Sequence, residues 1–134
     1  YRGDFRIEWY PKKASTAIVK DAFVIFTSGQ IDKATSSTAA NIVGTLMKTI
    51  AATDADYALN TLVPVRIPLN QNAEWEMDVT TGTLATTSVG LKFDLTDELG
   101  VNQSATTNKV VECTQFISAT KGIFKICGHI ALNQ

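Results

Sequence analysis

The sequence predicts a single-domain all-β fold, and three observations lead to that prediction. Short stretches rich in Val, Ile, Phe and Thr recur along the 134 residues, and turn-forming Gly, Ser and Asn separate them. Residues 74–79 read Glu, Trp, Glu, Met, Asp, Val, which is the alternation of a strand with one wet and one dry face. Neither a fixed-period repeat nor a low-complexity linker divides the chain. We therefore expect a single domain built from many short strands.

The first two elements are predicted from apolar periodicity and turn residues. Phe5, Ile7 and Trp9 recur at period two before Pro11, which indicates a strand or an extended arm. Residues 17–34 contain an apolar run, a Ser-Gly turn at 28–29 and a short return, which predicts a hairpin.

The middle of the chain contains the one ambiguous element. Apolar residues in 38–52 also fit a helical stripe, but Gly44 costs a helix about 1 kcal/mol, and Thr45 and Thr49 weaken it further. We therefore predict a strand over 42–50. The following stretch 62–69 alternates, yet Pro64 and Pro68 cannot donate to a ladder, so we expect an edge or bulged strand.

Four strands are expected in the last part of the chain. Residues 74–81 form a strand that ends at the Thr-Gly turn of 81–82. Residues 84–101 place four apolar side chains on one side of the next strand, namely Val89, Leu91, Phe93 and Leu95. Residues 109–116 and 122–132 then form a closing hairpin that turns near Thr120.

Charge and hydropathy exclude several partner classes. Twelve Lys and Arg balance thirteen Asp and Glu, so no basic excess attracts nucleic acid or an anionic membrane. The longest apolar runs fall far short of the roughly 20 residues that a membrane-spanning helix needs. No stretch has the form of a secretory signal. We expect a soluble protein with no nucleic-acid partner and no membrane partner.

The two cysteines are too few for a disulfide framework. A hairpin that turns near Thr120 places Cys113 directly opposite Cys127 on one face. Buried free thiols pack well in protein cores, so we expect two buried small apolar residues rather than a bond, although the bond remains open.

The chain shows no arrangement of residues typical of an enzyme. His129 is the only histidine and has no carboxylate close in sequence, and it forms no zinc-ligand spacing with the two cysteines. Asp94, Asp97 and Glu98 cluster without the spacing of a calcium loop, and we expect them to cap turns. No phosphate-binding loop and no nucleophile elbow occurs. We predict no catalytic residue, no metal and no cofactor.

The N-terminal segment is the candidate site for binding a partner. Four of the eleven aromatic residues lie in the first ten positions, with two arginines among them. Tyr, Trp and Arg dominate the hot spots of protein interfaces. The alternative is a first strand that covers its own core. The candidate partner-binding residues are Tyr1, Arg2, Phe5, Arg6, Trp9 and Tyr10.

Several segments together resemble the capsid decoration, or cement, proteins of tailed bacteriophages. They are "AFVIFTSGQIDKATSST", "IVGTLMKTI", "LVPVRIPLNQNAEWEMDV" and "SVGLKFDLTDELGVNQSATTNKVVECTQFISATKGIF", which together span residues 22–124. The resemblance implies a small single-domain β-barrel or β-tulip-like fold with short turns. Together with the pattern of the N-terminal residues, the resemblance predicts an extended N-terminal arm and first strand in residues 1–21 and a β-barrel domain in residues 22–134. It covers no part of the arm and carries over no binding residue.

The resemblance also implies a function. Such proteins are structural virion proteins that are assembled in the host cytoplasm, bind the outer surface of the capsid and stabilise contacts between major capsid subunits. The implied partners are the major capsid protein and further copies of the chain, a trimer being one form. Two alternatives remain: a tail, neck or head-fibre base component of the virion, or a small β-barrel carbohydrate-binding module. In the second, Trp75 would need to be exposed, whereas its alternating strand predicts burial.

Overall fold

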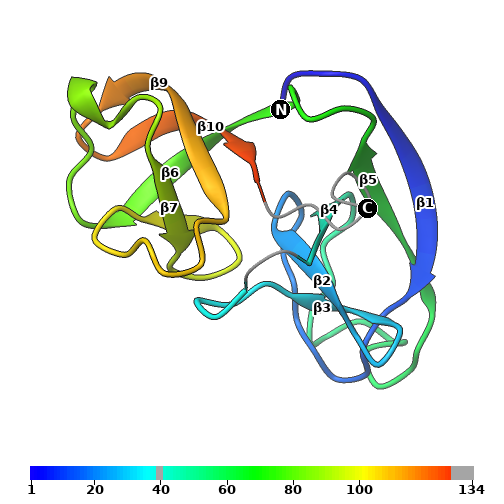
Figure 1. Ribbon diagram of the computed structural model, residues 1–134. Helices are drawn as coiled ribbons and strands as arrows, with labels where there is room; N and C mark the ends of the chain where they lie inside the picture. Colours follow the sequence, from blue (N-terminus) through cyan, green and yellow to red (C-terminus); the bar gives the residue numbers. More distant parts are fainter. Residues whose placement is uncertain (39–40, 128–134) are drawn as a thin grey trace.

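The computed structural model describes residues 1–38 and 41–127, and it shows an all-β fold with a closed barrel beside a second sheet (Figure 1). The predicted fold class is therefore confirmed. The barrel contains the second half of the chain and the open sheet contains the first half. The segment that joins the sheet to the barrel leads from the fifth strand into the sixth (Figure 1).

The open sheet has five strands in the order β1-β5-β4-β2-β3, all antiparallel to their neighbours. Its strands are β1 (Phe5–Pro11), β2 (Phe23–Thr27), β3 (Gln30–Lys33), β4 (Ile42–Leu46) and β5 (Leu62–Pro68). A bridge between Lys12 and Ile31 draws the end of β1 toward β3, so the sheet curls around its buried face.

The barrel closes in the order β10-β6-β8-β7-β9, and β9 pairs with β10 to complete the ring. Its strands are β6 (Glu74–Thr81), β7 (Lys92–Leu95), β8 (Gly100–Asn102), β9 (Val111–Ser118) and β10 (Lys121–Ile126), with a short 3-10 turn η1 (Thr86–Ser88) before β7. β6 and β8 are parallel, and the other pairs are antiparallel. Closure removes the free strand edges of this part of the fold.

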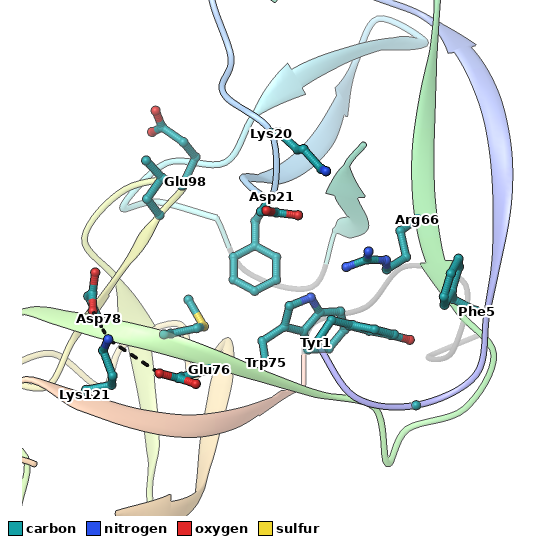
Figure 2. A pocket seen from close by; sticks show the side chains of 14 residues that line it. Tyr1, Phe5, Lys20, Asp21, Arg66, Trp75, Glu76, Asp78, Glu98 and Lys121 are labelled. Carbon is teal, nitrogen blue, oxygen red and sulfur yellow. Dashed lines mark ion pairs between the residues drawn. The ribbon is translucent and has the colours of Figure 1, made fainter. Parts of the chain in front are cut away.

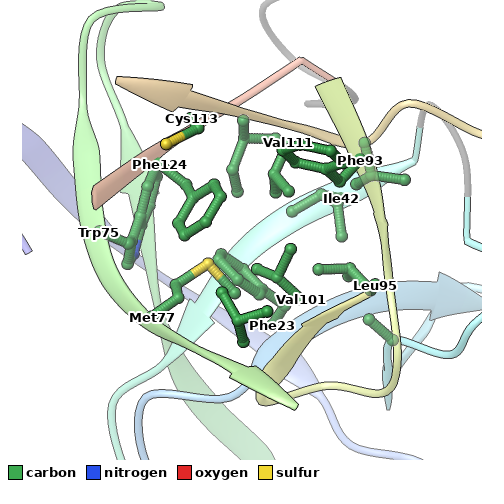
Figure 3. Packing of buried hydrophobic residues seen from close by; sticks show 14 of the residues in the cluster. Phe23, Ile42, Trp75, Met77, Phe93, Leu95, Val101, Val111, Cys113 and Phe124 are labelled. Atoms are coloured by element: carbon green, nitrogen blue, oxygen red, sulfur yellow. The ribbon is translucent and has the colours of Figure 1, made fainter. Parts of the chain in front are cut away.

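Two apolar clusters form the core. One lies on the curled side of the open sheet, around Val24, Leu46 and Val65. The other fills the barrel around Phe124 and also includes Phe23 of β2 (Figure 3). Since one cluster contains side chains from both the sheet and the barrel, the two parts pack together through a shared apolar contact.

Gly44 is required where β4 lies close to its neighbour β5. A Cβ atom at this position would overlap the carbonyl oxygen of Arg66. The pairing of β2 with β4 also skips Val43, which is an extra residue in the ladder. This bulge turns Ile42 and Thr45 toward the barrel side of the sheet while Val43 and Leu46 stay in the other cluster.

Several predicted elements are confirmed and others need correction. The hairpin over 17–34 forms as β2 and β3, and the ambiguous segment is a strand, although β4 ends at Leu46 instead of residue 50. The alternation of β6 is confirmed. Val89 and Leu91 are exposed, because η1 and a turn occupy the place of the expected long strand and β7 begins only at Lys92.

The predicted register of the closing hairpin is wrong. Cys113 lies opposite Phe124 and not opposite Cys127, because two register shifts occur between β9 and β10. Neither cysteine forms a disulfide bond; Cys113 is buried and Cys127 is half-buried. Burial raises the pKa of both thiols. The part of the predicted strand beyond residue 127, which includes His129, lies outside the described residues.

A buried lysine holds the long connection between β4 and β5. Lys12 is 1% exposed, and its ammonium donates hydrogen bonds to the carbonyl oxygens of Asp56, Tyr57 and Leu59 at 2.8, 3.0 and 2.5 Å. The side-chain amide of Asn60 donates in return to the Lys12 carbonyl oxygen at 2.9 Å. The three donors of the ammonium group are therefore satisfied by main-chain carbonyls of one loop.

We predict that Lys12→Met lowers the free energy of unfolding by about 3 kcal/mol, because three buried carbonyls lose a charged donor. The matched control is Lys13→Met, whose ammonium is exposed and pairs with Asp32 at the surface; it should change the value by less than about 0.5 kcal/mol. Urea denaturation of the two variants measures the difference. Equal effects at positions 12 and 13 would contradict the role of the buried ammonium.

Candidate functional site

The exposed large apolar side chains within the strands of the open sheet all belong to β1 and β5. In the register of this pair, Ile7 lies opposite Arg66 and Trp9 lies opposite Pro64. Val63, Val65 and Ile67 point to the other side, into the core. We call the surface formed by Phe5, Ile7, Trp9, Leu62 and Pro64 the open face. Its exposed members are Phe5 at 41%, Ile7 at 47%, Trp9 at 59% and Leu62 at 59%.

One row of side chains leads from the open face to the barrel. Directly opposite residues share one side of a sheet, so Ile7, Arg66, Thr45 and Phe23 form a row across β1, β5, β4 and β2. Burial increases along this row: Ile7 is exposed, Arg66 is half-buried, and Thr45 and Phe23 are buried. The same side of the sheet is therefore open at β1 and covered by the barrel at β2.

A cleft of about 750 Å³ lies where this row passes under the barrel (Figure 2). Phe5 and Arg66 line it from the sheet, and Glu76, Asp78 and Lys121 line it from the barrel strands. Lys121 pairs with both carboxylates, at 3.5 Å to Glu76 and 3.8 Å to Asp78. The cation of Arg66 and the acidic wall therefore face each other across the cleft.

Tyr1 closes one end of the cleft. Its ring packs edge-on against Trp75, with centroids 4.8 Å apart, and against Phe5 at 5.7 Å. The guanidinium carbon of Arg66 lies 4.6 Å from the centre of the Tyr1 ring and 4.9 Å from that of Phe5. Burial raises the pKa of the Tyr1 hydroxyl, against the opposing effect of the Arg66 charge. The N-terminal residue thus forms part of the wall and stacks on an arginine.

The second residue fastens this segment to β6. Arg2 and Glu74 exchange two main-chain hydrogen bonds, of 2.7 and 2.8 Å, and their side chains form an ion pair at 3.1 Å. The hydroxyl of Thr114 also donates to the Glu74 carboxylate at 2.6 Å. The Thr114 hydrogen bond, with the Arg2 charge, lowers the pKa of Glu74 against a smaller effect of burial.

The structure divides the six predicted partner-binding residues between different surfaces. Phe5 and Trp9 lie on the open face, and Tyr1 lies at the cleft. Arg2 pairs with Glu74, and Arg6 pairs with Glu8 at 3.2 Å on the opposite side of β1. Tyr10 packs edge-on against Phe26 beside the core, with centroids 5.0 Å apart. The segment is an edge strand of the sheet from residue 5 onward, with the aromatic side turned outward and not into the core.

Sequence reasoning missed Arg66 and Leu62. Their positions follow from the alternation of 62–67, which places both on the side opposite to Val63, Val65 and Ile67. What the sequence did not supply is the pairing of β1 with β5, which brings Arg66 beside the aromatic residues of β1.

Two of the three acidic residues around position 95, Asp94 and Asp97, cap turns as expected. Asp94 is buried and accepts main-chain hydrogen bonds from Asn108 and Lys109 at 2.7 and 2.8 Å. Asp97 accepts those of Leu99 and Gly100 at 2.9 and 3.0 Å. Within residues 1–38 and 41–127, no three His, Cys, Asp or Glu side chains lie together as a metal site would require. The same residues contain no helix long and apolar enough to cross a membrane.

Comparisons with known proteins found no matching family model, no matching curated protein and no matching solved structure.

We predict that protonation of Glu74 lowers the stability of the protein in acid. Because the pKa of Glu74 is lowered by folding, its contribution to stability is present above the ordinary pKa of about 4.3. It is lost as the pH falls through the lowered value. The difference in unfolding free energy between the wild type and Glu74→Gln should therefore shrink from neutral to acid pH.

The control for this prediction is Glu76→Gln on the same strand, whose side chain is exposed and pairs with Lys121 at the surface. Denaturation curves recorded at a series of pH values measure both variants. A Glu74→Gln variant with the pH dependence of the wild type would contradict the prediction.

Proposed function

We propose that this chain is a structural virion protein that decorates the outer surface of a phage capsid and stabilises contacts between major capsid subunits. The observation that carries the proposal is the open face. Three large apolar side chains of one strand point outward on a sheet whose other side is a packed core. Contiguous exposed apolar residues on a rigid element are typical of protein interfaces.

The composition of the open face fits a protein partner. Trp9 is the most exposed of the large apolar residues of β1, and the neighbouring open-face residues on β5 are Pro64 and Leu62, which lose little conformational freedom on binding. Tryptophan surrounded by such residues is a common interface hot spot. On a lattice of identical subunits, many such contacts act together, so each one contributes even where it is weak.

The sequence resemblance to decoration proteins supports the capsid as the partner, and the all-β fold is compatible with it. The proposal assigns no catalytic step to any residue. Self-association, a trimer among its forms, belongs to the same proposal, because decoration sites on an icosahedral lattice follow its symmetry.

The first test is the number of copies of this protein in purified phage particles, measured by quantitative mass spectrometry. Copies in the hundreds are expected for a protein that occupies capsid lattice sites. A handful of copies would instead support the tail, neck or head-fibre base alternative. Absence from particles would contradict the proposal.

A carbohydrate-binding module is the second candidate, since Phe5 and Trp9 are two exposed aromatic rings on one strand face. The version of that hypothesis that needs an exposed Trp75 is disfavoured, because Trp75 is buried. Saturable binding on a glycan array that Trp9→Ser abolishes would favour this candidate over the capsid.

We predict that Trp9→Ser raises the Kd for particles lacking the protein at least about tenfold, because loss of a hot-spot tryptophan typically costs about 2 kcal/mol or more. Stability should change little, since the side chain is mostly exposed. The matched control is Ile117→Ser, an exposed apolar residue on β9 of the barrel. Co-sedimentation with particles measures both. Normal occupancy for Trp9→Ser, or an equal loss for Ile117→Ser, would contradict docking through the open face.

A further inference from the structure

Arg66 is a cation that has no ion-pair partner in the described part of the chain. Among the described residues no carboxylate lies within ion-pair distance of its guanidinium, and the Nε atom is buried without a hydrogen-bond acceptor. Its close neighbours are the rings of Tyr1 and Phe5, which offer only their π faces. A partly buried charge without a counter-charge is unfavourable, and an incoming anion would offset that cost.

Two further polar groups near Arg66 are buried and have no hydrogen-bond partner within residues 1–38 and 41–127. The indole N–H of Trp75, a residue that lines the same cleft and is 6% exposed, donates to no acceptor. The hydroxyl of Thr45, next to Arg66 in the row across the sheet, also has no partner. Buried donors in folded proteins are nearly always hydrogen-bonded. Arg66 and Trp75 therefore offer unused donors in one cleft (Figure 2).

The walls of the cleft restrict the kind of anion. Tyr1, Phe5 and Phe23 form an aromatic surface that suits an aliphatic stem. The rest of the wall carries the carboxylates of Asp21, Glu76, Asp78 and Glu98, whose negative charge the ammonium groups of Lys20 and Lys121 balance only in part. This wall repels a dianion such as phosphate more than a single carboxylate.

We propose that the cleft binds the side-chain carboxylate of an Asp or Glu residue from a partner protein, with Arg66 as the anchor and the indole N–H of Trp75 as a second donor. The planar fork of a guanidinium matches a carboxylate in geometry. Phe5 belongs to both the cleft and the open face, so a partner that covers the open face brings its side chains to the cleft. The inference rests on the proposed function only for the identity of that partner.

The test uses the full chain without phage particles. Its only two tryptophans, Trp9 and Trp75, give two indole N–H signals in a ¹H–¹⁵N NMR spectrum, and Trp9→Phe assigns them. The probe is N-acetyl-glutamate N-methylamide, and its glutamine counterpart is the neutral control. We expect the glutamate probe to shift the Trp75 signal in a saturable manner, a larger shift than at Trp9, and no saturable shift with the glutamine probe.

Two variants connect the shift to Arg66. Arg66→Gln should weaken probe binding at least about tenfold, because it removes a charged donor. Arg66→Lys keeps the charge but loses the planar guanidinium, so it should weaken probe binding by less than Arg66→Gln does. The matched control is Arg6→Gln, an exposed arginine on the other side of the neighbouring strand, which should bind the probe like the wild type.

Three outcomes would overturn the inference. They are the absence of a Trp75 shift, equal shifts for the glutamate and glutamine probes, and tighter binding of inorganic phosphate than of the glutamate probe. The result is separable from that for the proposed function. A carboxylate-dependent shift at Trp75 in a protein that binds no particles would reject the capsid as partner and support the cleft. Particle binding that depends on Trp9, without any shift of the Trp75 indole signal, would support the capsid as partner and reject the cleft as a carboxylate site.

Discussion

The pairing of β1 with β5 in one register is the constraint on which the rest of the structure depends. A slip of one residue would exchange the two sides of β1, since side chains alternate along a strand. Arg6 and Glu8 would then lie on the open face, and Phe5, Ile7 and Trp9 would lie beside the core. The open face, the row that contains Arg66 and the contact of Phe5 with that arginine all require the observed register.

Both ends of β1 are fixed by contacts outside the ladder. Before the strand, Arg2 forms a main-chain bridge to Glu74 on the barrel. After it, the Lys12 ammonium is held by three carbonyls of the loop that precedes β5. The strand is therefore held at one end by the barrel and at the other by its own sheet. The charged pair of Arg6 and Glu8 lies on the core side at the free edge of the sheet, an arrangement that discourages further strand pairing at that edge.

The sequence predicts those features that depend on local pattern. The class of fold, the hairpin at Ser28–Gly29 and the burial of Trp75 follow from alternation and turn residues. Two features could not be predicted, because they depend on which strands meet. The side of β1 that faces outward is set by its pairing with β5, and the register of β9 with β10 is set by two irregularities that no residue pattern marks. The apolar period of Phe5, Ile7 and Trp9 correctly indicates a strand, but it would ordinarily indicate a side turned to the core.

The central claim is that the open face becomes covered when the protein binds its partner. Hydroxyl-radical footprinting of the protein, free and bound to phage particles, measures this directly, because mass spectrometry locates the oxidised side chains. We expect oxidation of Phe5 and Trp9 to fall sharply when the protein is bound to particles, while oxidation of Ile117 on the barrel stays as it is in the free protein. Unchanged oxidation of Phe5 and Trp9 in particle-bound protein would contradict the account.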